Sequence, residues 1–204
     1  MARMHRMDLD DMTSDDIPII NSWFRHDEAS VDTSWFPPGF RVDDELSQPH
    51  AAKLLKRTDR VDETVELISA HEWVVRCNLT HAPIGWICGE VWPCHDFNSD
   101  IVDGQLPDDV DDMPCATFQL SVAPSHRGRG YGTAMLTAIA TNLQLKGTQI
   151  WLGIDVKNMA SRIAADRAGF DHQFTTAHYK MQSGHDIRIG LYKHMMHFRH
   201  LTTT

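Results

Sequence analysis

The chain has 204 residues, of which 42% are hydrophobic, and a formal net charge of −9 with histidine neutral. This length is typical of one domain that buries roughly 70% of its unfolded surface, so we expect a single domain over residues 1–204. The acidic charge argues against a nucleic-acid partner. No signal peptide and no membrane-spanning apolar run is present, so we expect a soluble cytoplasmic protein with no membrane partner.

Cysteine and histidine spacing does not favour a metal centre. The chain has four cysteines: Cys77, Cys88, Cys94 and Cys115. They lack both C-x-x-C spacing and the density of a disulfide scaffold, so we expect reduced thiols. His194, His197 and His200 recur every third residue without a carboxylate or cysteine beside them, and we therefore expect no metal.

The first elements in chain order are a candidate strand over residues 4–9 and an amphipathic helix. Thr13 and Asp16 have the spacing of a capping box, and Ile17 and Ile20 begin the apolar face of that helix. A loop containing Trp35, Phe36 and two prolines follows. Residues 51–70 have a helical pattern, although 64–69 also fit a strand; we favour the helix.

Residues 71–79 and 84–92 have the composition of two strands, and the short turn between them predicts an antiparallel hairpin. An acidic insertion over residues 93–114 follows, rich in aspartate and poor in apolar residues. Such a charge run is usually a solvated loop, but beside an acceptor cleft it would attract a cationic amine.

The next stretch, residues 116–133, predicts a strand that runs into a glycine loop and then a helix. Phe118, Leu120 and Val122 alternate with polar residues, and Pro124 ends the ladder. The loop carries glycine at every second position: Gly128, Gly130 and Gly132. Because the helix that follows has free N–H groups and a positive dipole end at its start, we expect this loop to bind a phosphate.

Spacing excludes two common phosphate motifs, because the dinucleotide pattern needs glycine where Thr133 stands and the triphosphate pattern needs Gly-Lys-Ser/Thr. The pattern Arg127-x-x-Gly130-x-Gly132 instead resembles the pyrophosphate-binding motif of the GNAT superfamily of acyl-CoA-dependent N-acyltransferases. The bland alternative is a glycine turn that merely caps a helix.

A second motif strengthens the resemblance. Gly147 is a plausible residue at the end of the helix, residues 149–156 predict a strand, and a helix starts near Asn158. Asn158, with Ser161 three residues later and a closing Gly169-Phe170, looks like the next motif of the superfamily. Asn158 as N-cap and Gly169 as C′ residue also fit local physics.

The resemblance implies an α/β (α+β) fold, a GNAT-like mixed, mostly antiparallel central sheet with helices on both faces, and acetyl-CoA as co-substrate. The cofactor-binding residues it implies are Leu120, Ser121, Val122, Arg127, Gly128, Arg129, Gly130, Tyr131, Gly132, Thr133, Asn158 and Ser161. Backbone N–H groups of the Leu120–Val122 strand would serve as oxyanion donors. Arg127 and Arg129 could pair with CoA phosphates or remain solvated loop charges.

The chain departs from the family at two places. Ala165 stands where a Tyr often donates a proton to the leaving thiolate, and Ala116 stands where some relatives carry a catalytic Glu. Glu90 and Asp155, at the ends of neighbouring predicted strands, are therefore the first candidates for the general base, against the plain reading of exposed strand-end charges. No tyrosine is an evident substitute.

The resemblance implies N-acetyl transfer to a primary amine. The acidic surface favours a cationic small molecule such as an aminoglycoside or polyamine, while a protein N-terminus stays open. Trp35 and Phe36 either line that substrate site or fill the core edge. The alternative is a noncatalytic acyl-CoA-binding or interaction module. Residues 173–181 and 186–196 predict a closing hairpin, and pairing of such strands builds homodimers in many similar proteins.

Overall fold

The structure is a computed structural model that describes residues 7–24, 68–93, 114–142, 145–175, 179–180, 186–187 and 189–195; for Phe174 and the segments after Thr175 it describes only the backbone. Several predictions lie outside these residues: the helix over 51–67, the aromatic pair Trp35 and Phe36, the acidic insertion between Pro93 and Pro114, and the histidines at 197 and 200. None of the described helices is long and apolar enough to cross a membrane.

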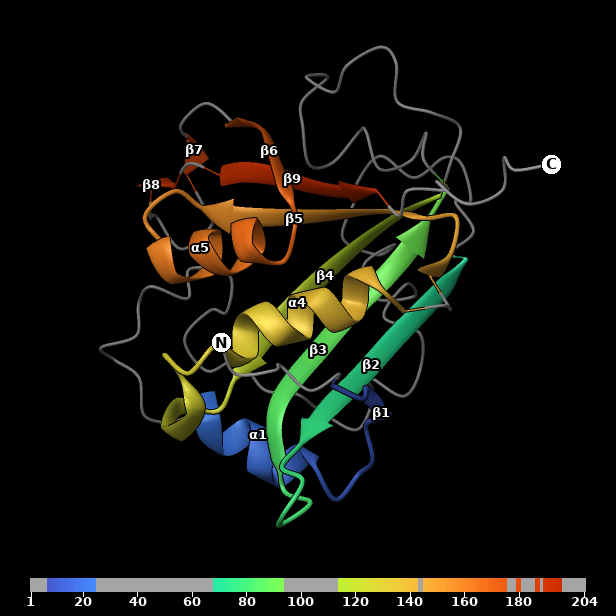
Figure 1. The fold of residues 1–204 in the computed structure, drawn as a ribbon, viewed down its shortest axis with the longest axis vertical. Helices are drawn as coiled ribbons and strands as arrows, with labels where there is room; N and C mark the ends of the chain where they lie inside the picture. The colour runs from blue at the N-terminus through green and yellow to red at the C-terminus, as the bar shows by residue number, and fades with distance from the viewer. Residues whose placement is uncertain are drawn as a thin grey trace, which may run out of the picture.

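A seven-stranded sheet organises the molecule, with the strand order β1-β2-β3-β4-β5-β9-β6 (Figure 1). Its strands are β1 (Asp10–Asp11), β2 (Ser69–Arg76), β3 (Pro83–Trp92), β4 (Cys115–Val122), β5 (Gln149–Asp155), β6 (Asp171–Thr175) and β9 (Ile189–Met195). Only β4 and β5 run parallel. A separate pair joins β7 (Tyr179–Lys180) to β8 (Asp186–Ile187). The mixed, mostly antiparallel sheet and the closing hairpin are as predicted.

Helices cover both faces of the sheet, as expected. On one face, α4 (Tyr131–Ala140) and α5 (Met159–Arg167) lie side by side in front of the strands in Figure 1. They close the larger core, in which Met135 and Ile139 are fully buried. On the other face, α1 (Ile17–Phe24) packs through Ile20 and Trp23 onto Trp86. Strand alternation explains the two cores, because successive side chains of β2 and β3 point to opposite faces.

A tight glycine contact holds β3 against β4. A Cβ atom on Gly89 would lie 2.1 Å from Cδ1 of Phe118 and 2.5 Å from the backbone oxygen of Thr117. Phe118 therefore lies flat over Gly89 and stacks on Trp73, with ring centroids 5.7 Å apart. The glycine lets an aromatic side chain fill the core at a position where a larger residue would separate the strands.

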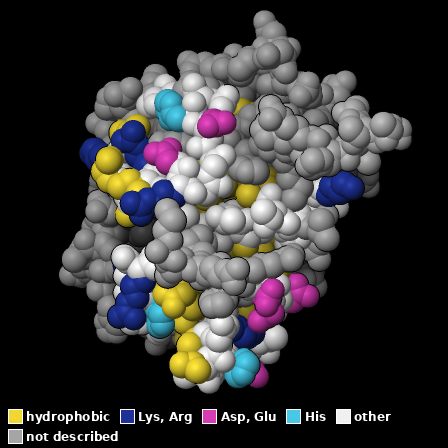
Figure 2. All heavy atoms as spheres, viewed as in Figure 1, with side chains coloured by type: hydrophobic (Ala, Val, Ile, Leu, Met, Phe, Trp, Pro, Cys, Tyr) yellow, Lys and Arg dark blue, Asp and Glu magenta, His cyan; other side chains and the backbone are white. Residues whose placement is uncertain are grey.

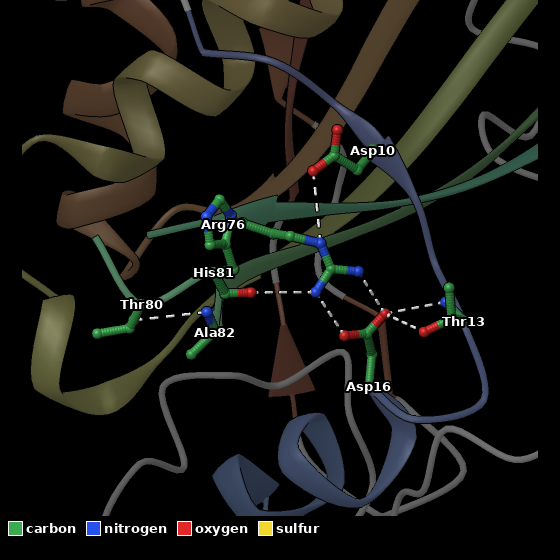
Figure 3. Close-up of polar contacts among 7 residues, drawn as sticks. All are labelled: Asp10, Thr13, Asp16, Arg76, Thr80, His81 and Ala82. Carbon is green, nitrogen blue, oxygen red and sulfur yellow. Dashed lines mark hydrogen bonds and ion pairs between the residues drawn. The ribbon is translucent and has the colours of Figure 1, made fainter. Parts of the chain in front are cut away.

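An ion-pair network attaches the start of α1 to the end of β2 (Figure 3). The guanidinium of Arg76 donates from both terminal nitrogens to Asp16 at 2.8 Å, and its Nε lies 3.4 Å from Asp10. Asp16 also accepts from the N–H and hydroxyl of Thr13 at 2.9 and 2.8 Å. Burial by itself would raise the pKa of Asp16, but these hydrogen bonds and the Arg76 charge lower it. The predicted capping box is only half formed, because the N–H of Asp16 donates to the Thr13 carbonyl and not to its hydroxyl, and α1 begins at Ile17.

Three local predictions are wrong. The helix after the glycine loop ends at Ala140, and Gly147 lies beyond it in a turn. The hydroxyls of Thr137 and Thr141 bond back to carbonyls of their own helix, which weakens its last turn. Residues 69–70 belong to β2 because they pair with β3, and the first strand is only Asp10–Asp11, so residues 7–9 are not strand. Pairing with a neighbouring strand outweighed local propensity.

Candidate functional site

The separation of β4 from β5 creates the central feature of the site. The two parallel strands pair only from Cys115 to Thr117 and from Gln149 to Trp151. Beyond that point they diverge, as Figure 1 shows, and β5 continues its pairing with β9. The second half of β4 therefore has a backbone edge that β5 does not bond. We call the space along this edge the wedge; it begins after Thr117.

The direction of the β4 amides follows from one hydrogen bond. The N–H of Ala123 donates to the carbonyl of Ile84 at 2.9 Å, so it points toward β3. Because successive N–H groups of a strand alternate in direction, the amides of Leu120 and Val122 point into the wedge and that of Ser121 points toward β3. Of the three predicted oxyanion donors, the geometry thus favours Leu120 and Val122.

The glycine loop lies at the mouth of the wedge, where β4 ends. Gly128 and Gly130 have φ values of 72° and 87°, which L side chains rarely adopt. Gly130 is the N-cap of α4 and has no side-chain cap, so the first-turn N–H groups lack intrahelical partners. A Cβ atom on either glycine would meet nothing within 4 Å. The loop therefore needs glycine for its backbone shape and offers open space to a ligand.

Arg127 connects this loop to the wedge. Its side-chain Nε donates to the carbonyl of Val122 at 3.1 Å, and its backbone N–H donates to the carbonyl of Pro124 at 3.3 Å. The side chain therefore ties the loop back onto the last residue of β4. Arg129 is exposed, and the ring of Tyr131 packs edge-on against His126 with centroids 5.5 Å apart. Contact between any of these side chains and a phosphate stays a prediction.

A second helix begins close to the wedge. Asn158 caps α5 by accepting from the N–H of Ser161 at 3.1 Å, as predicted. Gly169, with φ 87°, ends the helix: its N–H bonds to Asp166 and that of Phe170 bonds to Ala165, which is the Schellman arrangement. Since β5 leads into α5 and β4 leads into α4, two helix N-termini follow the diverging strand ends.

Positive charge gathers along the same edge of the molecule. Figure 2 shows Lys and Arg side chains on the side formed by α5 and the loop before α4. Apart from Arg76 and Lys146, the described basic side chains all belong to this region: Arg127, Arg129, Lys157, Arg162 and Arg167. In a chain of net charge −9 this is a local reversal of sign, and it suits a polyanion.

Of the two candidate bases, Glu90 has surroundings that suit a general base. It lies opposite Thr117, where the wedge begins, and is only 8% exposed. Its Oε2 accepts from the indole of Trp92 at 3.2 Å, while its buried Oε1 has no hydrogen-bond partner in the described structure. Burial raises the pKa of Glu90, and the Trp92 hydrogen bond offsets only part of that rise.

Asp155 serves the local turn instead. Its Oδ1 accepts from the N–H of Lys157 at 2.9 Å, and its carbonyl accepts from Asn158 at 2.8 Å. Such bonds lead β5 into α5. The structure therefore favours Glu90 over Asp155 as the candidate base. Ala116 of β4 and Ala165 of α5 are fully buried in the larger core, and neither side chain can exchange a proton.

The model of the acetyltransferase (GNAT) family matches residues 40–170, which is more than half of the chain. The chain belongs to this family. The residues so matched include the hairpin, the wedge, the glycine loop and α5. No functionally curated protein sequence matches the chain significantly.

Solved structures share the GNAT fold at low sequence identity. Spermidine N-acetyltransferase from Vibrio cholerae, in complex with CoA and spermine, is 15% identical with a TM-score of 0.62, covering 92% of this chain and 94% of that one. RimL, the ribosomal L7/L12 alpha-N-protein acetyltransferase in complex with CoA, is 15% identical with a TM-score of 0.62. The match covers 93% of this chain and 94% of that one. AAC(6')-Ib in complex with parmomycin and acetyl-CoA is 17% identical with a TM-score of 0.58, and the match covers 94% of each chain.

Sequence analysis did not single out Glu72 or Trp86. The register makes Glu72 a diagonal neighbour of Glu90 on one face of the hairpin, and the indole of Trp86 donates to Glu72 at 3.2 Å. The available signal was a carboxylate in each of two adjacent strands, which a correct register would have brought together. Within the described residues, no three His, Cys, Asp or Glu side chains are grouped as metal ligands would be.

Proposed function

We propose that this GNAT protein transfers an acetyl group from acetyl-CoA to a primary amine of a cationic small molecule. The observation that carries the proposal is the unpaired β4 edge directly before a left-handed glycine loop and the start of α4. Amides on that edge suit a thioester carbonyl, and helix-start amides with nearby arginines suit a pyrophosphate.

Groups along β4, the glycine loop and the start of α4 fit acetyl-CoA from its pyrophosphate to its thioester. Amides of the loop and of the first turn of α4 would hold the pyrophosphate, where the backbone leaves open space. Leu120 and Val122 would donate to the carbonyl oxygen as it gains negative charge. Acetyl-CoA supplies the acetyl group as a thioester, the leaving group being the CoA thiolate.

Glu90 would then move the proton. The acceptor arrives as an ammonium at neutral pH, so it must lose one proton before its nitrogen can attack. Glu90 accepts that proton, the nitrogen forms a bond to the carbonyl carbon, and the carbon–sulfur bond breaks. A second proton leaves the nitrogen and protonates the thiolate, giving the amide and free CoA. A buried carboxylate with a raised pKa suits this task near neutral pH.

The two co-substrates would meet from opposite faces of the sheet. The loop, α4 and α5 lie on one face, whereas Glu90 shares the other face with Trp86 and Cys88, because alternate residues of β3 point to the same side. Similar structures include complexes with spermine and with an aminoglycoside. RimL, which acetylates a protein N-terminus, is equally similar, so the preference for a small cationic acceptor rests on the acidic net charge of −9.

Calorimetric titration with acetyl-CoA, with NADH and ATP as controls, tests the co-substrate, and a panel of amines assayed for CoA release tests the reaction. Selective micromolar binding at one site per chain, followed by CoA release with at least one amine, is the expected result. Binding without any turnover would instead favour a noncatalytic acyl-CoA-binding module. If acetyl-CoA does not bind, the proposed function is wrong.

A further inference from the structure

Polar side chains occupy part of the sheet face that α1 covers. The helix packs on the Trp86 end of this face, where the ring of Phe24 meets Trp86 edge-on at 6.2 Å. Further along, the strand register brings polar residues onto the same side, since paired residues share a face. They are Glu72 and Gln119, which flank Cys88, and the neighbouring pair Glu90 and Thr117. We call these four residues the polar face.

Two indole–carboxylate pairs define the polar face. Trp86 donates from its ring nitrogen to Oε1 of Glu72, and Trp92 donates to Oε2 of Glu90, both at 3.2 Å. Each indole holds its carboxylate in place. The side chain of Glu90 is 92% buried, yet its Oε1 has no hydrogen-bond partner in the described structure. An unsatisfied buried acceptor is costly, so this atom fits a donor supplied from outside the chain.

Both carboxylates neighbour one thiol, that of Cys88. Glu72 is opposite Cys88, and Glu90 is two residues from Cys88 along β3, which makes the carboxylates diagonal neighbours with Cα atoms roughly 7–8 Å apart. Burial raises the pKa of Cys88, and the charges of Glu72 and Glu90 raise it further. A thiol whose pKa is raised is a poor nucleophile, so Cys88 gives no reason to expect covalent chemistry on this face.

From this arrangement we propose that the polar face binds an acceptor carrying two ammonium groups, one at Glu72 and the other, which becomes acetylated, at Glu90. The inference rests on the proposed acetyl transfer. An ammonium offers three N–H donors, so it would satisfy Oε1 of Glu90. Indole rings beside each carboxylate favour cations as well. An aliphatic diamine of about four to six carbons spans roughly 6–9 Å, which is similar to the separation of the two Cα atoms.

The test compares α,ω-diaminoalkanes of three to eight carbons with n-alkylamines of the same length, using full-length protein and saturating acetyl-CoA. We expect kcat/KM at least tenfold higher for the best diamine than for its matched monoamine, with the optimum at about four to six carbons. Glu72→Gln keeps an acceptor for the Trp86 indole but loses the charge. It should bring the diamine-to-monoamine ratio to near one, mainly by raising KM for the diamine.

Asp166→Asn is the matched control, because it removes one carboxylate from an exposed position of α5. It should leave the diamine preference unchanged. Calorimetric titration of 1,5-diaminopentane into the protein with CoA gives a second measurement, in which Glu72→Gln should bind at least tenfold more weakly.

Two failures are distinguishable. Equal kcat/KM for diamines and monoamines in the wild type would overturn this inference while leaving acetyl transfer intact. If no amine releases CoA, the proposed function fails, and the titration decides about the polar face: absent or Glu72-independent diamine binding overturns it. Thermal unfolding of each variant excludes loss of the fold as the cause.

Discussion

The glycine loop and the polar face contribute to one proposed site, but they are built differently. The loop occupies a single stretch of sequence, and its shape follows from glycines with φ values of 72° and 87° between a strand and a helix. The polar face joins side chains of β2, β3 and β4, which only the pairing register brings together. A local element withstands changes elsewhere in the chain, whereas an assembled one depends on every strand that carries it.

The largest expected effect is the loss of kcat when Glu90, a residue of the polar face, is replaced. Glu90→Gln should lower kcat by about 10²–10⁴-fold, the usual contribution of a general base, with affinity for acetyl-CoA unchanged. The variant should not lose stability at pH 7, because a carboxyl whose pKa is raised by burial destabilises the fold once it is ionised. Steady-state kinetics, calorimetry and thermal unfolding measure the three quantities.

Asp155→Asn is the comparison for Glu90→Gln, and it should lower kcat far less, since Asp155 serves a turn. The pH profile adds a second check. A base works when deprotonated, so kcat/KM should rise with pH through a value above the ordinary Glu range, and Glu90→Gln should lack that rise. An equal loss of kcat in both variants would contradict the assignment of Glu90.

The next largest expected effect is the loss of stability when the ion-pair network that joins α1 to β2 is broken. Arg76→Gln would leave Asp16, 3% exposed, without its charged partner, and should lower the free energy of unfolding by about 3 kcal/mol. The pKa of Asp16 is lowered in the fold, so its stabilisation is present above the unfolded-state pKa and is lost as pH falls through the folded-state pKa. Denaturant unfolding against pH measures both effects.

The double variant Asp16→Asn with Arg76→Gln completes a thermodynamic cycle for this pair. A coupling near zero would mean that the contact adds nothing to the stability of α1. Wild type and Arg76→Gln should also converge in stability toward low pH; parallel curves would contradict the role of the carboxylate.

The third prediction concerns the local part. Gly130→Ala forces a left-handed backbone on an L residue, which costs about 1–2 kcal/mol, and should weaken acetyl-CoA binding about tenfold because the first-turn amides of α4 shift. Gly147, with φ 82°, carries the same strain in a turn beyond α4. Gly147→Ala should therefore destabilise similarly and leave the affinity unchanged. Equal affinities in all three proteins, by calorimetry, would separate the loop from the co-substrate.

The smallest effect is expected at the start of α5. Asn158→Ala removes the acceptor of the Ser161 N–H and should cost about 1 kcal/mol in unfolding free energy, whereas Asn158→Ser keeps a capping oxygen and most of the stability. Thermal unfolding of the two variants gives the comparison. An unaffected Asn158→Ala would show that tertiary packing alone holds this helix end.

The sequence by itself determined the elements whose causes are local. The strand that ends at Val122, the glycine loop, the Asn158 cap and the Gly169 end of α5 all follow from residues within a few positions of each other. These pieces were enough to indicate the family and to predict a phosphate-binding loop. The hairpin of β2 and β3 was also predicted, because its turn separates two strand-like runs.

Tertiary structure decided what depends on strand pairing. The extent of β4–β5 pairing sets where the wedge begins, and only the register assigns the Leu120 and Val122 amides to it. The pairing of β2 with β3 makes Glu72 a diagonal neighbour of Glu90. Arg76 meets Asp16 across 60 positions of sequence. Such contacts carry no local signal, since a shift of one residue in pairing would move every side chain of a strand to the other face.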